Sequence, residues 1–311
     1  MKSSNIGGQA VMEGIMMKNG SEYAVAVRKS NGEIELKQET YHSVFEKMSA
    51  LTKIPFVRGV FNFIDSMVLG TTTLMFSASF FEEEEEKKDM TEDEMRKHEK
   101  KEKILMNVTM VFSFAIAIAL FMVVPYLLSS LLKPMITSYY VRTIIEGFVR
   151  IGIFVAYVML ISRMEDIQRT FMYHGAEHKC INCIEHGLPL TVDNVRVSSR
   201  LHKRCGTSFL FLVLFIGIIL FFFIQVESPI LRVLLRIALL PVIAGISFEV
   251  LKLAGRSENV LVNLISKPGL AIQKLTTKEP DDSMIEVAIA AVEAVFDWKT
   301  YQNENFPKAE K

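Results

Sequence analysis

The chain has 311 residues, half of them hydrophobic, and its 35 basic and 35 acidic side chains balance to a net charge near zero. No basic patch alternates with aromatic residues, so no nucleic-acid partner is expected, whereas the apolar content admits a membrane protein. Three cysteines in a reducing cytosol are expected to be metal ligands or buried thiols, and a structural disulfide is not expected.

Residues 1–41 are predicted to be a glycine-rich cytosolic segment that contains a β-hairpin. Apolar residues alternate on both sides of Asn31-Gly32, which predicts a hairpin over residues 23–36. The earlier glycines lack the Lys-Ser/Thr ending of a phosphate loop, so we attribute them to tight backbone. The N-terminus lacks the layout of a cleaved signal peptide, and it is therefore expected to be retained.

Residues 42–81 have a helical pattern that is interrupted at Pro55. A polar stripe follows on an otherwise apolar helix; it consists of Arg58, Asn62, Asp65 and Ser66. Such a stripe predicts an amphipathic or re-entrant helix. Residues 82–103 are a run of charges, which predicts a solvated linker helix.

Two pairs of apolar segments follow, over residues 104–161 and 207–254. The runs 104–132 and 208–226 have no charged side chain and are long enough for the roughly 20 apolar residues that span a bilayer. The partner runs 143–161 and 230–251 carry a few charges, and we predict that they are spans as well. The fold class is therefore a mainly α integral membrane protein with about four transmembrane helices, the additional helix and the small β-hairpin region.

Lysine and arginine side chains flank these spans unevenly. They are concentrated in residues 82–103 and 162–206 and are sparse on the two opposite connections. Positive flanks tend to stay in the cytosol, so the loop 162–206 and both termini are predicted to be cytosolic. A fifth span would put the two termini on opposite sides of the membrane, contrary to this prediction. The lipid bilayer is thus the first expected partner.

Residues 255–311 are predicted to form cytosolic helices. Asp281 and Asp282 stand where an N-cap belongs, directly after Pro280. An apolar stripe then recurs at helical spacing through residues 285–296, which predicts a helix that docks on the rest of the cytosolic part.

The stretch "YHGAEHKCINCIEHG", residues 173–187, carries the candidate site. On a helix, His174, Glu177, His178 and Glu185 share one face, and the order HxxEH is that of the inverzincin peptidases. Two imidazoles one turn apart can hold one divalent ion, and the glutamate beside them can accept a proton from water. Three protein ligands are usual at catalytic zinc, and the later segment "RLHKRCGTSF" supplies His202 or Cys205 as the third.

The same segments contain a rival metal site. Cys180, Cys183, His202 and Cys205 have nearly the spacing of a closed structural zinc site. On a helix, however, the two earlier cysteines point about 120 to 160° away from the histidine pair. Only one of the two sets can therefore surround a shared ion.

Several motifs together resemble one known family; they are "GGQAVMEGIMMK", "YAVAVRKSNGEI", "IPFVRGVFNFIDSMVLG", "YHGAEHKCIN", "SRLHKRCGTSF" and "LTTKEPDDSMIEVAIAA". The chain resembles the YqhQ-type family of bacterial membrane proteins, a family of unknown function whose members are often described as metal-dependent enzymes. The matching motif positions are Gly7, Gly8, Glu13, Gly14, Arg58, His174, Glu177, His178, Glu185, His202 and Cys205. The resemblance implies a bacterial cytoplasmic membrane and variable residues at the positions of Cys180 and Cys183, which favours the histidine site.

The preferred expectation is a membrane-bound, zinc-dependent hydrolase of unknown substrate with Glu177 as general base. Glu185 could orient a ligand, and Glu13 or Arg58 could approach the site from the N-terminal motifs. A scaffold or protein-biogenesis factor with a structural metal and a membrane-protein partner is the main alternative. A transporter is the third, because the predicted spans contain charges; these are Glu146, Arg150, Arg232, Arg236 and Glu249.

Overall fold

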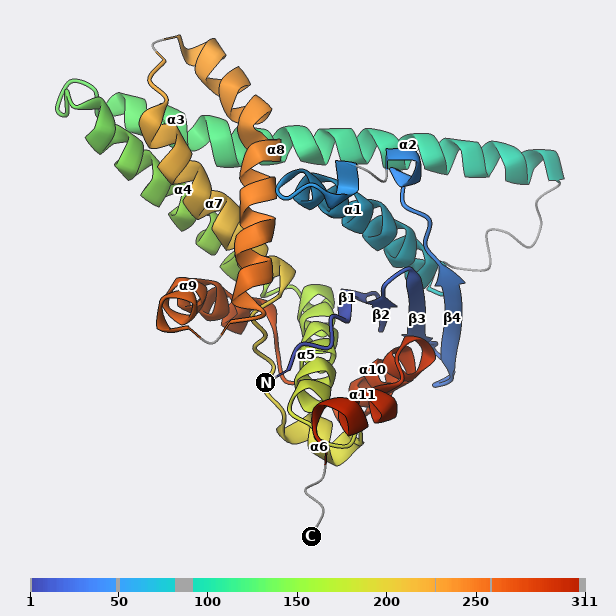
Figure 1. Ribbon diagram of the computed structural model, residues 1–311. Helices are drawn as coiled ribbons and strands as arrows, with labels where there is room; N and C mark the ends of the chain where they lie inside the picture. Colours follow the sequence, from blue (N-terminus) through green and yellow to red (C-terminus); the bar gives the residue numbers. More distant parts are fainter. Residues whose placement is uncertain (1, 49–50, 82–91, 227, 258, 308–311) are drawn as a thin grey trace. The chain divides into compact units, whose positions relative to one another are not determined.

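The structure is a computed structural model that describes residues 2–48, 51–81, 92–226, 228–257 and 259–307 (Figure 1). It is mainly helical with a small antiparallel sheet near the N-terminus, as predicted. The strands are β1 (Gly7–Val11), β2 (Gly14–Asn19), β3 (Glu22–Arg28) and β4 (Ile34–Thr40). The helices are α1 (Val57–Ala78), α2 (Glu92–Ile118), α3 (Val124–Leu131), α4 (Tyr139–Ile161), α5 (Glu165–Glu185), α6 (Val192–Val197), α7 (Gly206–Phe223), α8 (Pro229–Ala254), α9 (Val260–Thr276), α10 (Asp282–Val295) and α11 (Trp298–Asn305).

The chain divides into two compact units. The first comprises Met1–Phe80, Val158–Ile216 and Leu239–Lys311, and the second comprises Phe81–Tyr157 and Gly217–Ala238. The first unit contains the sheet and the candidate site.

The sheet has the strand order β1-β2-β3-β4. The predicted hairpin is β3–β4, and its turn uses Gly32 at a φ of 87°, a conformation that glycine adopts without strain. A second hairpin, β1–β2, precedes it and was not predicted, because glycines and methionines hide the alternation. Gly14 permits close contact between strands, since a Cβ there would lie 2.3 Å from the Ala26 carbonyl oxygen.

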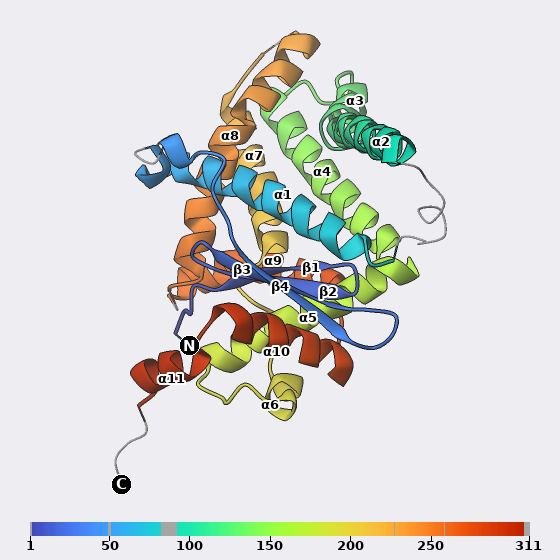
Figure 2. The ribbon, with the colours of Figure 1, turned by 90° about the vertical axis from the view of Figure 1, so that its right-hand side faces the viewer.

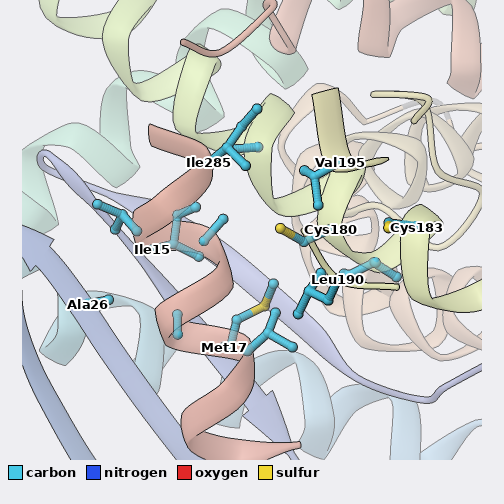
Figure 3. Packing of buried hydrophobic residues seen from close by; sticks show 14 of the residues in the cluster. Ile15, Met17, Ala26, Cys180, Cys183, Leu190, Val195 and Ile285 are labelled. Atoms are coloured by element: carbon cyan, nitrogen blue, oxygen red, sulfur yellow. The ribbon is translucent and has the colours of Figure 1, made fainter. Parts of the chain in front are cut away.

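One face of the sheet is covered by α5 and α10 (Figure 2). Their shared core joins Ile15 and Met17 of β2 with Ile184 of α5 and Ile285 of α10, all fully buried (Figure 3). Burying each such side chain contributes roughly 1.5–3 kcal/mol. The predicted N-cap of α10 is present: Asp281 Oδ1 accepts a hydrogen bond of 2.9 Å from the Met284 N–H. Three distant chain segments therefore form one folded body.

The regular helix α1 is shorter than the helical pattern over residues 42–81. Between His42 and Val57 the described residues form only two short 3₁₀ turns, η1 (Glu46–Met48) and η2 (Leu51–Lys53). Pro55 disfavours helix in the residue before it. Asp65 binds the earlier segment, because its carboxylate accepts hydrogen bonds from Ser43 Oγ at 2.6 Å and the Val44 N–H at 3.1 Å. The segment is thereby folded back along α1.

Helix α1 packs closely on α8. A Cβ on Gly59 would lie 3.0 Å from the Cα of Gly245, so two glycines set the separation of these helices. Next to this crossing, Arg58 donates two hydrogen bonds to the carboxylate of Glu249. Paired in this way, the two charges stabilise the contact between the helices.

In the second unit, α2 and α3 are joined by a π-helical segment, η3 (Ala119–Val123). Pro125 has no N–H for the carbonyl four residues earlier, and the Phe121 carbonyl accepts instead from Arg150 Nε at 2.8 Å. Arg150 and Arg236 both donate to the carboxylate of Glu146, and all three side chains are buried. The predicted charged linker lies partly outside the described residues; from Glu92 onward it belongs to α2.

Five helices are long and apolar enough to cross a membrane, among the residues that the structure describes. They are Val57–Ala78, Ile104–Leu131, Tyr139–Ile161, Gly206–Phe223 and Ile230–Ala254. These helices suggest a multi-pass membrane protein. The sequence patterns predicted about four spans, and α1 is the additional helix.

Candidate metal centre

Helix α5 places His174 and His178 one turn apart on the same side. Their ring centroids are 4.4 Å apart. Between them, Gly175 admits the chain that follows α9, since a Cβ at this position would lie only 2.0 Å from the Lys278 carbonyl oxygen. The glycine in the motif therefore lets a loop from the far end of the sequence pack directly against the histidine pair.

Cys205 completes a group of three candidate ligands. It lies immediately before α7, and its Sγ is 3.3 Å from Nε2 of His174. One ligand atom from each of His174, His178 and Cys205 lies within 4.8 Å of the others. No other such group of histidine, cysteine and acidic side chains is found among the described residues. Two imidazoles and a thiol are a donor set that suits zinc.

The other ring nitrogen of each histidine is already bonded. Nδ1 of His174 is 2.9 Å from the Thr276 carbonyl oxygen, and Nδ1 of His178 is 2.7 Å from the Arg200 carbonyl oxygen. A carbonyl oxygen only accepts, so each Nδ1 carries the hydrogen and each Nε2 keeps its lone pair. This is the arrangement that orients histidine ligands in metal sites. No sequence pattern pointed to Thr276, because it acts through its main chain.

Glu177 lies beside the three ligands, buried at 5% exposure. Its Oε2 is 3.9 Å from Nε2 of His174. Burial raises the pKa of its carboxyl above the ordinary value, while His174 and a hydrogen bond from the Gly8 N–H act in the opposite direction. Gly8 is required for this contact, because a Cβ on it would lie 2.9 Å from Cγ of Glu177. Strand β1 thus fixes the carboxylate from the N-terminal side.

His202, the other candidate third ligand, points elsewhere. Its Nε2 is 3.4 Å from Oε2 of Glu185, and it is absent from the group of three. Its main chain is held at both ends by Gln273, which accepts from the His202 N–H at 2.9 Å and donates to its carbonyl at 2.7 Å. Gln273 also donates to Ser208 Oγ, so one buried amide fixes the segment that carries Cys205. Sequence reasoning missed this glutamine.

Glu185 belongs to a network that ties down the N-terminus. Its Oε1 accepts from the Ser4 N–H at 2.7 Å and from the Ser4 hydroxyl at 2.9 Å, and Arg204 donates to the same oxygen. Burial alone would raise the pKa of Glu185, but the contacts with His202, Arg204 and Ser4 hold it below the ordinary value. Burial also lowers the pKa of His202. The pair is therefore a neutral imidazole beside a carboxylate.

Glu13 and Arg58, expected near the site, bind other partners. Glu13 lies in the β1–β2 turn at a φ of 47°, and its carboxylate accepts two hydrogen bonds from Arg169 of α5. Arg58 pairs with Glu249 of α8. Both residues position the elements around the site and neither lies against the candidate ligands.

Cys180 and Cys183 lie in the apolar core, where Figure 3 shows them near Leu190 and Val195. Burial raises the pKa of Cys180 well above its ordinary value and that of Cys183 to about 11. Neither thiol belongs to the group of candidate ligands found among the described residues. The rival four-ligand site is not assembled.

A cavity of about 570 Å³ lies next to the candidate ligands. Part of its wall is β1, through Gly8, Gln9 and Ala10, and part is formed by His174 and Glu177. The remaining wall comes from α1, α5, α7, α8 and the segment before α7; its larger side chains are Asn62, Phe63, Phe171, Arg204, Phe209, Leu210, Phe248 and Leu251. The carboxylate and one imidazole thus face a space large enough for a substrate segment.

Comparisons with known proteins identify relatives over most of the chain. The family described as "Protein of unknown function (DUF1385)" matches residues 54–298. The "Uncharacterized protein YqhQ" of Bacillus subtilis (strain 168) is 36% identical over 307 residues, which cover 96% of this chain and 94% of the relative. No solved structure matches.

Proposed function

The chain belongs to the DUF1385 family, and we propose that it is a metal-dependent hydrolase at the cytosolic face of a bacterial cytoplasmic membrane. The observation that carries the proposal is the group of His174, His178 and Cys205 with both Nδ1 atoms bonded to carbonyls. Their ligand atoms converge from two chain segments, and a buried carboxylate lies beside them.

Zinc is the ion that this donor set suits best, with three protein ligands and one open position. Held by these residues, a zinc ion would supply an activated water as the nucleophile. Glu177 is placed to take the proton from the attacking water and to deliver it to the leaving group. Its carboxylate is held for this role by the Gly8 N–H, and it faces the cavity.

The shared core supports a membrane arrangement with an even number of crossings. Strand β2, α5 and α10 pack together, so the segments that carry them lie on one side of the bilayer. Three candidate spans separate β2 from α5, and two separate α5 from α10. One of the first three therefore does not cross. Helix α1 is the least apolar of the five and contains the buried Asp65, so we assign it as the re-entrant or interfacial helix.

Four crossings with the basic loop 162–206 inside place both termini in the cytosol. The candidate metal centre then lies at the inner membrane surface, because Cys205 directly precedes α7.

A structural metal in a scaffold or protein-biogenesis factor is the second candidate. It is favoured by the position of the ligands, since an ion bound by α5 and Cys205 would clamp the entry of α7 to the cytosolic core. A membrane-protein partner would then be expected. Of the charges that suggested a transporter, Glu249 pairs with Arg58 and Glu146 pairs with Arg150 and Arg236, while Arg232 donates to the Val226 carbonyl.

The proposal is tested by elemental analysis of the full-length protein purified in detergent. We expect close to one zinc per chain, lost in His178→Ala and Cys205→Ser. Cys180→Ala is the matched control, because this thiol is equally buried but lies in the core, and it should retain the metal. A wild type without metal, or loss only in the control, would exclude the centre.

Hydrolysis is tested next with Glu177→Gln. This variant should keep the metal and lose turnover of any substrate that the wild type hydrolyses. Equal turnover by the metal-replete variant would contradict the role of Glu177 and favour the structural alternative.

A further inference from the structure

Strand β1 is an edge strand whose free side reaches the candidate metal centre. In an antiparallel ladder, the main-chain groups of successive residues point alternately toward the partner strand and away from it. Val11 and Gly14 close the two-residue turn of the β1–β2 hairpin and bond to each other, so the main-chain groups of Gly8, three residues before Val11, point away from β2. The Ala10 N–H and C=O point the same way by this alternation, and the Met12 N–H, two residues further, donates outward to Ser77 Oγ at 3.1 Å.

Ala10 has main-chain groups available on this side. Among the described residues, no hydrogen bond links its N–H or C=O to a group outside the sheet. Ala10 is partly exposed and lines the same cavity as His174 and Glu177. Exposed edges of this kind accept extended peptides by adding a strand, and main-chain hydrogen bonds supply the affinity.

Another part of the cavity wall is apolar. It includes Phe63 of α1, Phe209 of α7 and Phe248 of α8, and the ring centroids of Phe63 and Phe209 are 5.4 Å apart. All three helices are candidate membrane spans. A chain segment between β1 and these helices would therefore have hydrogen-bonding partners on one side and apolar side chains on the other.

On the basis of the proposed function, we propose that the substrate is an extended, apolar polypeptide segment that pairs with β1 as a fifth strand. A lipid acyl chain would fill the apolar wall but would offer nothing to the Ala10 N–H and C=O. In the reaction one water adds to the peptide carbonyl carbon and the C–N bond breaks. Glu177 transfers the proton to the leaving amine, so the products are a carboxylate and an amine.

The test uses the full-length zinc-loaded protein in lipid nanodiscs and a mixture of ten-residue peptides rich in Leu, Val, Phe, Ala and Thr, with cleavage followed by mass spectrometry. Ala10→Pro removes the outward N–H, a change that edge strands tolerate. Ala10→Val keeps the N–H and is the matched control. We expect Ala10→Pro to lower kcat/KM about fivefold to tenfold relative to Ala10→Val, the loss of one hydrogen bond, with zinc content unchanged.

A second measurement does not depend on a protein variant. In a cleaved peptide, single backbone N-methylation should lower kcat/KM at two positions that are two residues apart and leave the position between them within about twofold, because only the Gly8 and Ala10 carbonyls of β1 face an added strand.

Four outcomes are distinguished. Cleavage that is lost in Glu177→Gln, weakened in Ala10→Pro and periodic in N-methylation supports the inference. Cleavage that is lost in Glu177→Gln but indifferent to Ala10→Pro and to N-methylation overturns the inference and leaves the hydrolase. Hydrolysis of the nanodisc phospholipids without peptide cleavage also overturns the inference and leaves the hydrolase. Peptide cleavage that persists in Glu177→Gln, or no hydrolysis at all, overturns the proposed function together with the inference.

Discussion

Replacing Gly8 by alanine tests how strand β1 is seated against the candidate centre. The added Cβ would lie 2.7 Å from the Met16 carbonyl oxygen, 2.7 Å from Sδ of Met17 and 2.9 Å from Cγ of Glu177. The methionine sulfur can move, but the carbonyl belongs to β2 and the carboxylate side chain is buried. Overpacking of this kind costs roughly 1–3 kcal/mol.

Gly7 provides the matched control. It precedes Gly8 in the same strand, and a Cβ there meets nothing within 4 Å. Gly7→Ala should therefore change stability by less than about 0.5 kcal/mol. In a unit of this size 1 kcal/mol corresponds to about 2–4 °C, so Gly8→Ala should lower the Tm by roughly 2–12 °C.

The assay follows thermal unfolding in detergent by the fluorescence of Trp298, the single tryptophan, which packs against the core of the same unit. Turnover should fall more than stability, because displacing a catalytic group by about 1 Å can cost about 100-fold. If Gly8→Ala and Gly7→Ala unfold at the same temperature and turn over substrate equally, β1 does not hold Glu177 in the way described.

Three further predictions concern the surrounding network. Gln273→Ala should weaken zinc binding about tenfold, measured by competition with a chromophoric chelator, because the segment before α7 loses its anchor; an unchanged affinity would show that this anchor is dispensable. Glu146→Ala leaves Arg150 and Arg236 buried without their carboxylate and should cost about 3–5 kcal/mol in denaturant unfolding, so a loss below about 1 kcal/mol would contradict the pairing. The pKa of Glu185 is depressed in the folded protein, so its contacts stabilise the fold above about pH 4 and lose this effect as the pH falls through the folded pKa. The Tm difference between wild type and Glu185→Gln should accordingly be largest near neutral pH and shrink on acidification, and a difference independent of pH would refute the assignment.

The sequence allowed the site to be predicted where local periodicity determines geometry. His174, Glu177 and His178 lie on one helix, so their spacing alone placed them together. The sequence alone could not decide between His202 and Cys205 as the third ligand. The path of the segment that carries both residues is determined by Gln273, about 70 residues later. A contact between distant segments leaves no trace in a local pattern.

The fold, like the site, could be predicted where the sequence signal is local and not where it depends on distant contacts. Long apolar helices and the hairpin at Asn31-Gly32 have strong local signals. Strands β1 and β2 have weak local signals, because glycine has a low strand propensity. Gly8 and Gly14 are needed there for close contacts with neighbouring strands and, at Gly8, with α5. Glu13 and Arg58 were expected to approach the site, but they bind Arg169 and Glu249, partners in distant elements that no local pattern identifies.

The core that joins β2, α5 and α10 has a consequence for biosynthesis. Strand β2 ends at Asn19, and α10 contributes core residues up to Val292. A ribosome that adds roughly 5–20 residues per second needs roughly 14–55 s to synthesise the intervening stretch. Throughout this time the apolar face of the sheet has no α10 to cover it. All five candidate membrane helices are synthesised in the same interval. The core is therefore completed only after them, and the nascent N-terminal sheet is the segment that a chaperone would have most reason to protect.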